Sequence, residues 1–440
     1  MIEQQEFVAR RTALLATCEP NSLIIIAAAQ ECTRSNDTEY RFRQDSDFWY
    51  LTGFNEPNAY LVMSNADGAG FTTCIFVQPS DPTAEIWHGR RLGVESAIAT
   101  LAVDTACSVE QVAQLLPKML NGHSHLYYAQ YHQSYLDELI REALSVCYRA
   151  PKQSMNAPRH QHDIRPALHA MRLIKSEAEL DLMQQAADIS ARAHIRAMQR
   201  SQAGVYEYQL QAEIEHEFLQ SGAHAPAYAS IVGGGSNACI LHYTENQDKI
   251  NNGDLVLIDA GAEFQGYAAD ITRTFPVNGR FTKAQAELYQ LVLDCQLAAL
   301  GKLKPNNTIS QAMDACLVIM VDGLKSLGLL HGDTRTIIEN KDYRQYFMHG
   351  LGHWLGLDVH DVGDYKQDGA DVLLRPGMVM TVEPGLYIAP DADVPEAYRG
   401  IGIRIEDDIV ISESGNRILT DKVPKTIEQI ETLMAGQAET

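Results

Sequence analysis

The sequence contains no CxxC pair and no membrane-length apolar run, and we expect no secretory leader. Its eight cysteines are scattered over 440 residues, which favours a reduced protein over a disulfide scaffold. The longest apolar run near the N-terminus, residues 23–29, is far shorter than a bilayer requires. No apolar h-region precedes a small-residue cleavage site there. We therefore expect a cytoplasmic protein with no membrane partner.

Basic residues are also too few for a nucleic-acid binder. The 57 Asp and Glu residues outnumber the 35 Lys and Arg residues, and the formal charge is -22. Nucleic-acid binding needs a basic surface, so we expect no nucleic-acid partner. A solvated acidic surface accounts for most of the charge, and composition alone does not favour a metal site.

The first part of the chain alternates strand and helix patterns. β-rich runs at residues 23–29, 59–64 and 71–78 are followed by helical spacing at residues 109–120 and 135–150. Strands with interleaved helices indicate an α/β domain.

A boundary follows this α/β region. Residues 151–166 contain three prolines and no periodicity, and we interpret them as a linker. Ser176 and Glu179 then have the spacing of a capping box, which predicts a helix start. Long helices and short strands joined by glycine turns make up the rest. We predict an α/β domain with its linker over residues 1–172 and an α+β catalytic domain over residues 173–440.

Two aspartates occur in apolar strand patterns. Asp259 ends the run at residues 255–259, and Asp270 lies inside the pattern at residues 267–275. If these strands pair, both carboxylates can point to one face. A carboxylate at the interior end of an apolar strand is costly unless it is paired or bound to a metal. Taken singly, a turn-capping Asp259 and a solvent-facing Asp270 are the simpler interpretations.

Three histidines fall within the glycine-rich segment HGLGHWLGLDVHD at residues 349–361. They are His349, His353 and His360, and the glycines between them allow close approach of the backbone. Neutral imidazole suits a transition metal or proton transfer. A lone histidine among apolar residues is usually a satisfied core residue, but three in one such segment favour a functional site.

Two glutamates follow apolar patterns nearer the C-terminus. Glu383 lies in TVEPG, and Glu406 lies in IRIED. Alternation in the second motif places Arg404 and Glu406 on one face. An arginine beside a metal-bound carboxylate is a sensible outer partner, although a surface ion pair explains this motif equally well on its own.

Taken together, these residues form an oxygen-rich ligand set with one imidazole. Such a set favours two Mn²⁺ ions over a thiolate-type zinc site, and it requires no other cofactor. Two such metals can share a water molecule, lower its pKa and stabilise the oxyanion formed at a scissile carbonyl.

In this order, the residues resemble the metallopeptidase superfamily with the pita-bread fold, which includes methionine aminopeptidase, prolidase and aminopeptidase P. The segment at residues 349–361 is similar to the proline-peptidase signature at every position. The resemblance implies that Asp259 binds one metal and that His353 and Glu383 bind the other. It also implies that Asp270 and Glu406 bridge the two metals.

The same resemblance implies a second set of residues that act on the substrate. His242, His349 and His360 match the substrate-contacting histidines of the family. Glu383 is our candidate general base, and Arg404 is its basic neighbour in the catalytic set.

The N-terminal half is similar to the aminopeptidase P family, in the segments FRQDSDFWYLTGF at residues 42–54 and EIWHGR at residues 85–90. This similarity implies a hydrolase that removes the first residue from peptides with proline second, by a metal-bridging hydroxide. It also implies a homo-oligomer, either a dimer or a tetramer. Prolidase, an Xaa-Pro dipeptidase, is the alternative, and a non-catalytic pita-bread binding protein is a third. Creatinase lacks the metal-ligand set and fits poorly.

Overall fold

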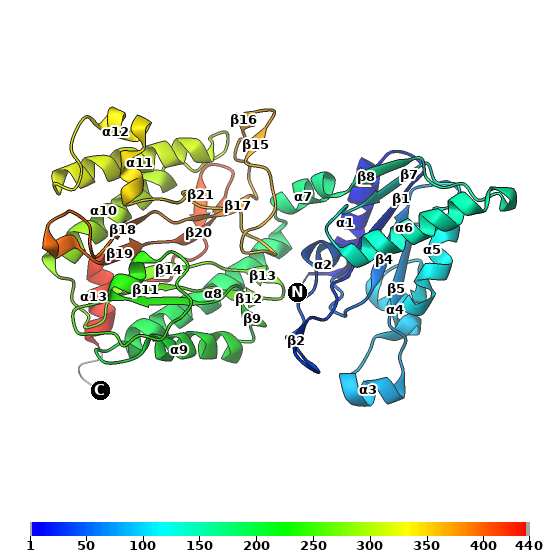
Figure 1. The fold of residues 1–440 in the computed structure, drawn as a ribbon, viewed down its shortest axis with the longest axis horizontal. Helices are drawn as coiled ribbons and strands as arrows, with labels where there is room; N and C mark the ends of the chain where they lie inside the picture. The colour runs from blue at the N-terminus through cyan, green and yellow to red at the C-terminus, as the bar shows by residue number, and fades with distance from the viewer. Residues whose placement is uncertain (1, 437–440) are drawn as a thin grey trace. The chain divides into compact units, whose positions relative to one another are not determined.

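The structure, a computed structural model, describes residues 2–436. The chain divides into two compact units, Met1–Met171 and Arg172–Thr440 (Figure 1). None of the described helices is long and apolar enough to cross a membrane.

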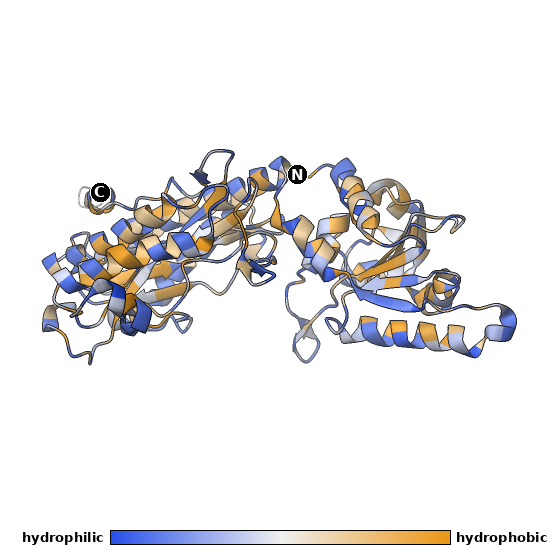
Figure 2. Ribbon diagram, turned by 90° about the horizontal axis from the view of Figure 1, so that it is seen from above, coloured by the Kyte–Doolittle hydropathy of each residue, from blue (hydrophilic) through white to orange (hydrophobic). Residues whose placement is uncertain are grey.

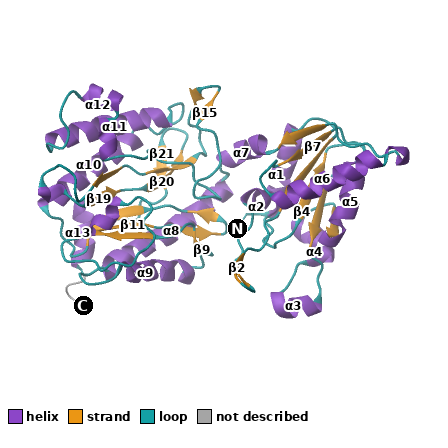
Figure 3. Ribbon diagram, viewed as in Figure 1, coloured by secondary structure: helices purple, strands orange, loops and turns teal. Residues whose placement is uncertain are grey.

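The first unit contains a six-stranded mixed sheet with the order β6-β5-β4-β1-β7-β8 (Figures 1 and 3). Its strands are β1 (Ser22–Ala27), β4 (Tyr60–Ser64), β5 (Thr73–Val77), β6 (Thr105–Ser108), β7 (His125–Tyr128) and β8 (His160–Asp163). The β1–β4 and β4–β5 pairs are antiparallel. The β1–β7, β5–β6 and β7–β8 pairs are parallel.

Helices cover this sheet, and a short hairpin projects from the unit. The elements are α1 (Gln4–Thr17), β2 (Thr33–Ser35), β3 (Thr38–Glu39), α2 (Ser46–Thr52), α3 (Pro82–His88), α4 (Gly93–Leu101), α5 (Val112–Leu120) and α6 (Ser134–Arg149). Leu23 and Ile25 of β1 pack with Leu116 of α5 and Ile140 of α6. The alternate residue Ile24 points to the opposite face and is also buried. The strands are accordingly mainly hydrophobic in Figure 2, whereas the helices alternate.

The interpretation of residues 151–166 as a linker is wrong for part of this range. Strand β8, His160–Asp163, forms the edge of the sheet beside β7, and helix α7 (Arg165–Leu173) follows it. The sequence of β8 is HQHD, and its first two residues are exposed. An edge strand does not need to bury both faces, so it carries no hydrophobic alternation for a sequence pattern to detect.

The second unit surrounds short antiparallel strands with long helices. Its helices are α8 (Glu177–Arg200), α9 (Glu207–Gln220), α10 (Lys283–Leu300), α11 (Ile309–Ser326), α12 (Thr334–Asn340) and α13 (Ile427–Ala435). The capping box predicted at Ser176 and Glu179 is confirmed at the start of α8. Its strands include β9 (Ala225–Pro226), β10 (Ile231–Gly234), β11 (Leu255–Asp259), β12 (Ala262–Phe264), β13 (Tyr267–Ala268), β14 (Thr272–Pro276), β17 (Val379–Val382), β18 (Gly385–Ile388), β19 (Ile401–Arg404), β20 (Asp407–Ile411) and β21 (Asn416–Ile418).

Two predicted strands of this unit are interrupted at acidic residues. The pattern at residues 267–275 is divided into β13 and β14, and Asp270 lies between them rather than inside a strand. The apolar strand pattern around Glu406 is likewise divided, between β19 and β20. Val382 is opposite Asp407, and Gly385 is opposite Arg404, in one continuous register. Glu383 and Glu406 are therefore opposite each other at the interruption.

Candidate active site

A cavity of about 480 Å³ lies in the second unit, within the range typical of small-molecule sites. Every residue predicted to bind metal or substrate lines it: Asp259, Asp270, His242, His349, His353, His360, Glu383, Arg404 and Glu406. The structure thus brings together residues that are spread over more than half of this unit's sequence.

Asp259 reaches the cavity from the end of β11, and Asp270 reaches it from the segment between β13 and β14. Asp259 is the last residue of β11, and Thr272 of β14 lies opposite it. The backbone N–H of Asp270 donates to Asp408 Oδ2 at 3.0 Å. The Tyr228 hydroxyl contacts Asp259 Oδ1 and Asp270 Oδ1, each at 2.5 Å. The two carboxylates therefore face one another across a single hydroxyl group.

The two glutamates enter from the interrupted β-hairpin. Glu406 Oε2 accepts a hydrogen bond from Thr272 Oγ1 at 2.6 Å. Glu383 Oε1 lies 3.4 Å from Thr381 Oγ1, which also accepts from the His353 backbone N–H at 3.0 Å. Threonine hydroxyls therefore orient both carboxylates.

His353 lies among the carboxylates. Its Nε2 is 3.4 Å from Asp270 Oδ2 and 3.7 Å from Glu383 Oε1. Its Nδ1 is 2.9 Å from the Trp354 carbonyl oxygen, which fixes the ring orientation. One ligand atom each from Asp270, His353 and Glu406 lies within 4.8 Å of the other two.

The pKa shifts of the cavity residues indicate an excess of negative charge. Burial and the neighbouring Asp259 carboxylate raise the pKa of Asp270. Burial raises the pKa of Glu383 to about 7, against the effects of His353 and Arg404. Burial and Asp270 raise the pKa of Glu406 well above its usual range. Burial alone would lower the pKa of His353, but contact with Asp270 raises it to about 9.

This donor set fits divalent metal ions. Among the described residues that line the cavity, Arg404 is the one permanent cation, and four carboxylates line the same cavity. Buried carboxylates require compensating charge. Carboxylate oxygens are hard donors of the kind that Mn²⁺ accepts, and the imidazole of His353 is a further transition-metal ligand.

The other histidines form the walls near these carboxylates. His349 Nε2 is 2.8 Å from the Tyr387 hydroxyl, and burial with nearby Arg404 lowers the pKa of His349 to about 4. The ring of His360 meets that of His353 edge-on at 4.3 Å between centroids. Burial and the charge of His353 lower the pKa of His360. Both imidazoles are therefore neutral near pH 7.

Arg404 is placed by three side chains. Its Nη2 donates to Asp259 Oδ2 at 2.6 Å, its Nη1 to the Tyr387 hydroxyl at 2.9 Å and its Nε to Thr272 Oγ1 at 3.1 Å. The sequence predicted an arginine beside a carboxylate but did not identify Asp259 as its partner.

Sequence reasoning missed Tyr228, Thr272 and Tyr387. All three bind predicted site residues through hydroxyl groups. Tyrosine and threonine in or near apolar strands have the ordinary pattern of core residues, so no sequence signal separates them from packing positions.

Comparisons with known families agree with this geometry. Residues 181–413 match the model of Metallopeptidase family M24, and residues 7–127 match the aminopeptidase P N-terminal domain. The chain therefore belongs to metallopeptidase family M24. The predicted fold class, an α/β N-terminal domain followed by an α+β pita-bread catalytic domain, is confirmed. The family implies divalent metal ions as cofactors.

Particular relatives cover nearly the whole chain. The Xaa-Pro aminopeptidase of Escherichia coli is 52% identical over 435 residues, with 99% of this chain and 98% of the relative covered. Xaa-Pro aminopeptidase 3 of Homo sapiens is 36% identical, with coverages of 98% and 86%. Zinc-substituted E. coli aminopeptidase P, in complex with product, matches with a TM-score of 0.98 and 51% identity over 100% of both chains. The aminopeptidase of Pseudomonas aeruginosa has a TM-score of 0.98 and 44% identity, with coverages of 100% and 99%.

Proposed function

We infer that the protein is a Xaa-Pro aminopeptidase, a metallo-exopeptidase that hydrolyses the bond between an N-terminal residue and a following proline. One observation carries this inference: a relative with this activity is 52% identical over 99% of the chain, both domains included. The convergence of the predicted residues on one cavity supports it. Neither prolidase nor a non-catalytic binding protein has comparable support.

We propose that the cofactors are two Mn²⁺ ions. Asp259 would hold one ion, His353 and Glu383 the other, and Asp270 and Glu406 both. When bound, such ions supply an activated water molecule at neutral pH and stabilise negative charge on the scissile carbonyl oxygen. The oxygen-rich donor set supports manganese over a thiolate-type zinc site.

The side chains around the ions would then move protons and orient the peptide. Glu383 would accept the proton from the attacking water, because its carboxylate lies beside His353 in the same cavity. The leaving proline nitrogen must be protonated before the bond breaks cleanly, and the proton that Glu383 accepts would reach it through His360 or His242. His349 would bind the carbonyl oxygen. Arg404 would orient the Asp259 carboxylate through their 2.6 Å contact.

Selection for proline follows from what its nitrogen lacks. Proline has no N–H, so a site without an acceptor at that position binds it without penalty. Alanine at the second position leaves an N–H unpaired, which costs roughly 1–3 kcal/mol. The free α-amine would be compensated by the acidic residues, and an acetylated N-terminus would lose this contact.

Peptide assays with Mn²⁺ test this function. We expect kcat/KM to be about 5- to 150-fold higher for Xaa-Pro-Yaa than for Xaa-Ala-Yaa of matched length, the equivalent of 1–3 kcal/mol. Equal values would contradict proline selection and leave the metal site standing. Extending the series to Xaa-Pro dipeptides tests the remaining alternative, because preferential cleavage of dipeptides would identify a prolidase.

We also propose a cytoplasmic homo-oligomer, a dimer or tetramer. Its support is the exposed apolar pair on α3, where Ile86 is 79% and Trp87 80% exposed in the single chain. Large exposed apolar side chains that adjoin each other mark contact surfaces. Sedimentation of the parent and of Trp87→Glu tests this proposal. It is refuted if the parent already sediments as a monomer, with the same mass as the variant.

We propose residues 1–172 and 173–440 as the functional domains.

A further inference from the structure

The β-hairpin that carries the two glutamates contains a backbone acceptor that its partner strand cannot satisfy. At the interruption, Pro384 lies opposite Ile405, and the Ile405 N–H donates to the Pro384 carbonyl at 3.3 Å. The reciprocal bond of an antiparallel pair cannot form, because proline has no N–H. The Ile405 carbonyl, which immediately precedes Glu406, therefore needs a donor from outside the hairpin.

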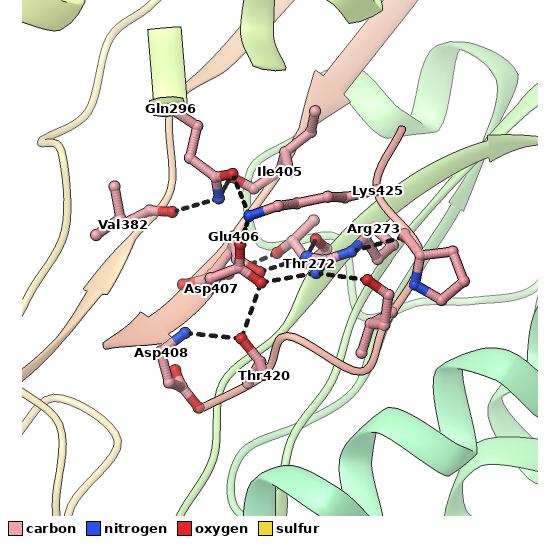
Figure 4. A network of polar contacts seen from close by, with 12 residues as sticks. Thr272, Arg273, Gln296, Val382, Ile405, Glu406, Asp407, Asp408, Thr420 and Lys425 are labelled. Carbon is pink, nitrogen blue, oxygen red and sulfur yellow. Dashed lines mark hydrogen bonds and ion pairs between the residues drawn. The ribbon is translucent and has the colours of Figure 1, made fainter. Parts of the chain in front are cut away.

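Gln296 of α10 is that donor (Figure 4). Its side chain is fully buried. The amide Nε2 donates to the Ile405 carbonyl and to the Val382 carbonyl, each at 3.2 Å. Val382 immediately precedes Glu383, so one side-chain amide binds the peptide group before each of the two glutamates.

The other end of the Gln296 amide is also fixed. Its Oε1 accepts from Lys425 Nζ at 3.2 Å, and Lys425 Nζ donates to Asp407 Oδ2 at 2.6 Å (Figure 4). Arg273 Nη2 donates to Asp407 Oδ1 at 2.7 Å, while its Nη1 donates to the Glu406 carbonyl at 2.6 Å. These contacts determine which way the Gln296 amide points.

We propose that Gln296 is a positioning residue for the metal centre, which keeps Glu383 and Glu406 opposite each other where the strand ladder is interrupted. This inference rests on the proposed ligand set. Gln296 itself does not touch the cavity. Without the two hydrogen bonds from Gln296, the strands can separate at the interruption. The Glu383 and Glu406 carboxylates then no longer keep fixed positions relative to each other.

Mn²⁺ binding to chelator-treated protein tests this role without any measurement of activity. Gln296→Met keeps the length of the side chain and removes its hydrogen bonds. Outer partners of metal ligands typically contribute 10- to 100-fold to affinity, so we expect the variant to bind at least one Mn²⁺ about 10- to 100-fold more weakly in isothermal titration calorimetry. Gln296→Glu keeps the acceptor for Lys425 but has no amide donor, and we expect the same loss. It serves as the second variant if Gln296→Met does not fold.

Gln285→Met is a matched control on the same helix. Gln285 is 7% exposed and donates its amide to the Gly253 carbonyl at 2.8 Å, at the N-terminal end of α10. We expect it to lower the unfolding temperature while Mn²⁺ affinity stays at the parent value. A general loss of packing would affect both variants alike.

The parent protein and Glu406→Ala separate two kinds of failure. If the parent binds two Mn²⁺ ions, Glu406→Ala loses binding and folded Gln296→Met binds like the parent, the positioning role is wrong. If Glu406→Ala binds Mn²⁺ normally, the ligand assignment is wrong instead. Loss of binding in Gln285→Met equal to that in Gln296→Met would also overturn the role.

Discussion

Two groups of buried carboxylates in the second unit differ in how their charge is compensated. Asp361 is buried with Lys175 Nζ at 2.8 Å from its Oδ2 and Arg172 Nη2 at 2.5 Å from its Oδ1. Burial alone would raise the pKa of Asp361, but the two cations lower it below its usual range. In the cavity, by contrast, burial and neighbouring carboxylates raise the pKa of Asp270 and Glu406.

The difference separates a structural ion pair from a site that needs a cofactor. The charge of the buried Asp361 carboxylate is compensated by its own two cations. These ion pairs hold two segments of the chain together. The cavity has four carboxylates and one permanent cation, and burial with mutual repulsion opposes the ionisation of Asp270 and Glu406. Divalent ions supply the missing charge. Substitution, added Mn²⁺ and acid pH should therefore affect the two kinds of site differently.

Substitution of a shared ligand should have the largest effect. We expect Glu406→Ala to lower kcat/KM by more than the roughly 10²–10⁴-fold typical of a proton-transfer residue, because one change disturbs both ions. Metal analysis of the purified variant should show a reduced content. Normal activity with normal metal content would exclude the bridging role.

Substitution of a cavity histidine should affect turnover but not the ions. We expect His360→Ala to lower kcat by roughly 10²–10⁴-fold if the imidazole transfers a proton or orients the substrate. Metal content should stay close to that of the parent. If the ions were lost as well, His360 would be a ligand.

Removal of Asp361 should affect stability instead. Asp361→Ala removes the carboxylate that compensates the buried cations Arg172 and Lys175. Such a loss typically costs roughly 3–5 kcal/mol in unfolding free energy. Arg172 retains its 2.8 Å contact with Asp358, so the loss should fall at the lower end. Denaturant unfolding measures it, and a change below about 1 kcal/mol would show that the pair contributes little.

Added Mn²⁺ should stabilise through the cavity alone. At a free concentration of 100 times Kd, one site contributes about 2.7 kcal/mol to the free energy of unfolding. We expect this increment in the parent and in Asp361→Ala, and its absence in Glu406→Ala. Thermal unfolding with Mn²⁺ or with chelator measures all three. If Mn²⁺ no longer stabilised Asp361→Ala, the proposed difference between the Asp361 ion pairs and the cavity carboxylates would be wrong.

The smallest effect concerns pH. The folded-state pKa of Asp361 is lowered, so its contribution to stability is present above its unfolded pKa of about 3.9 and is lost as pH falls through the folded value. Asp361→Asn should therefore show a shallower fall in unfolding free energy below pH ~4 than the parent. Urea unfolding at each pH gives these free energies. If they fall equally steeply with pH in the parent and in the variant, this sign is wrong.

The residues that line the cavity could be picked out from the sequence because their chemistry appears in short motifs. The aspartates, the glycine-rich histidine segment and the glutamate motifs each combine reactive side chains with strand patterns, and all line one cavity. The α/β and α+β division followed from the periodicity of strands and helices. Strand β8 escaped prediction, because its four polar residues have no alternation.

Other features depended on tertiary structure, because they join segments far apart in the chain. The sequence by itself determined which side chains are able to bind metal and move protons. Only the fold decided that Tyr228 lies between Asp259 and Asp270, and that Arg404 donates to Asp259. The role of Gln296 is the clearest case, because a glutamine inside a helix resembles any polar residue. It becomes significant only where Pro384 leaves the Ile405 carbonyl without a strand donor, over 100 residues away.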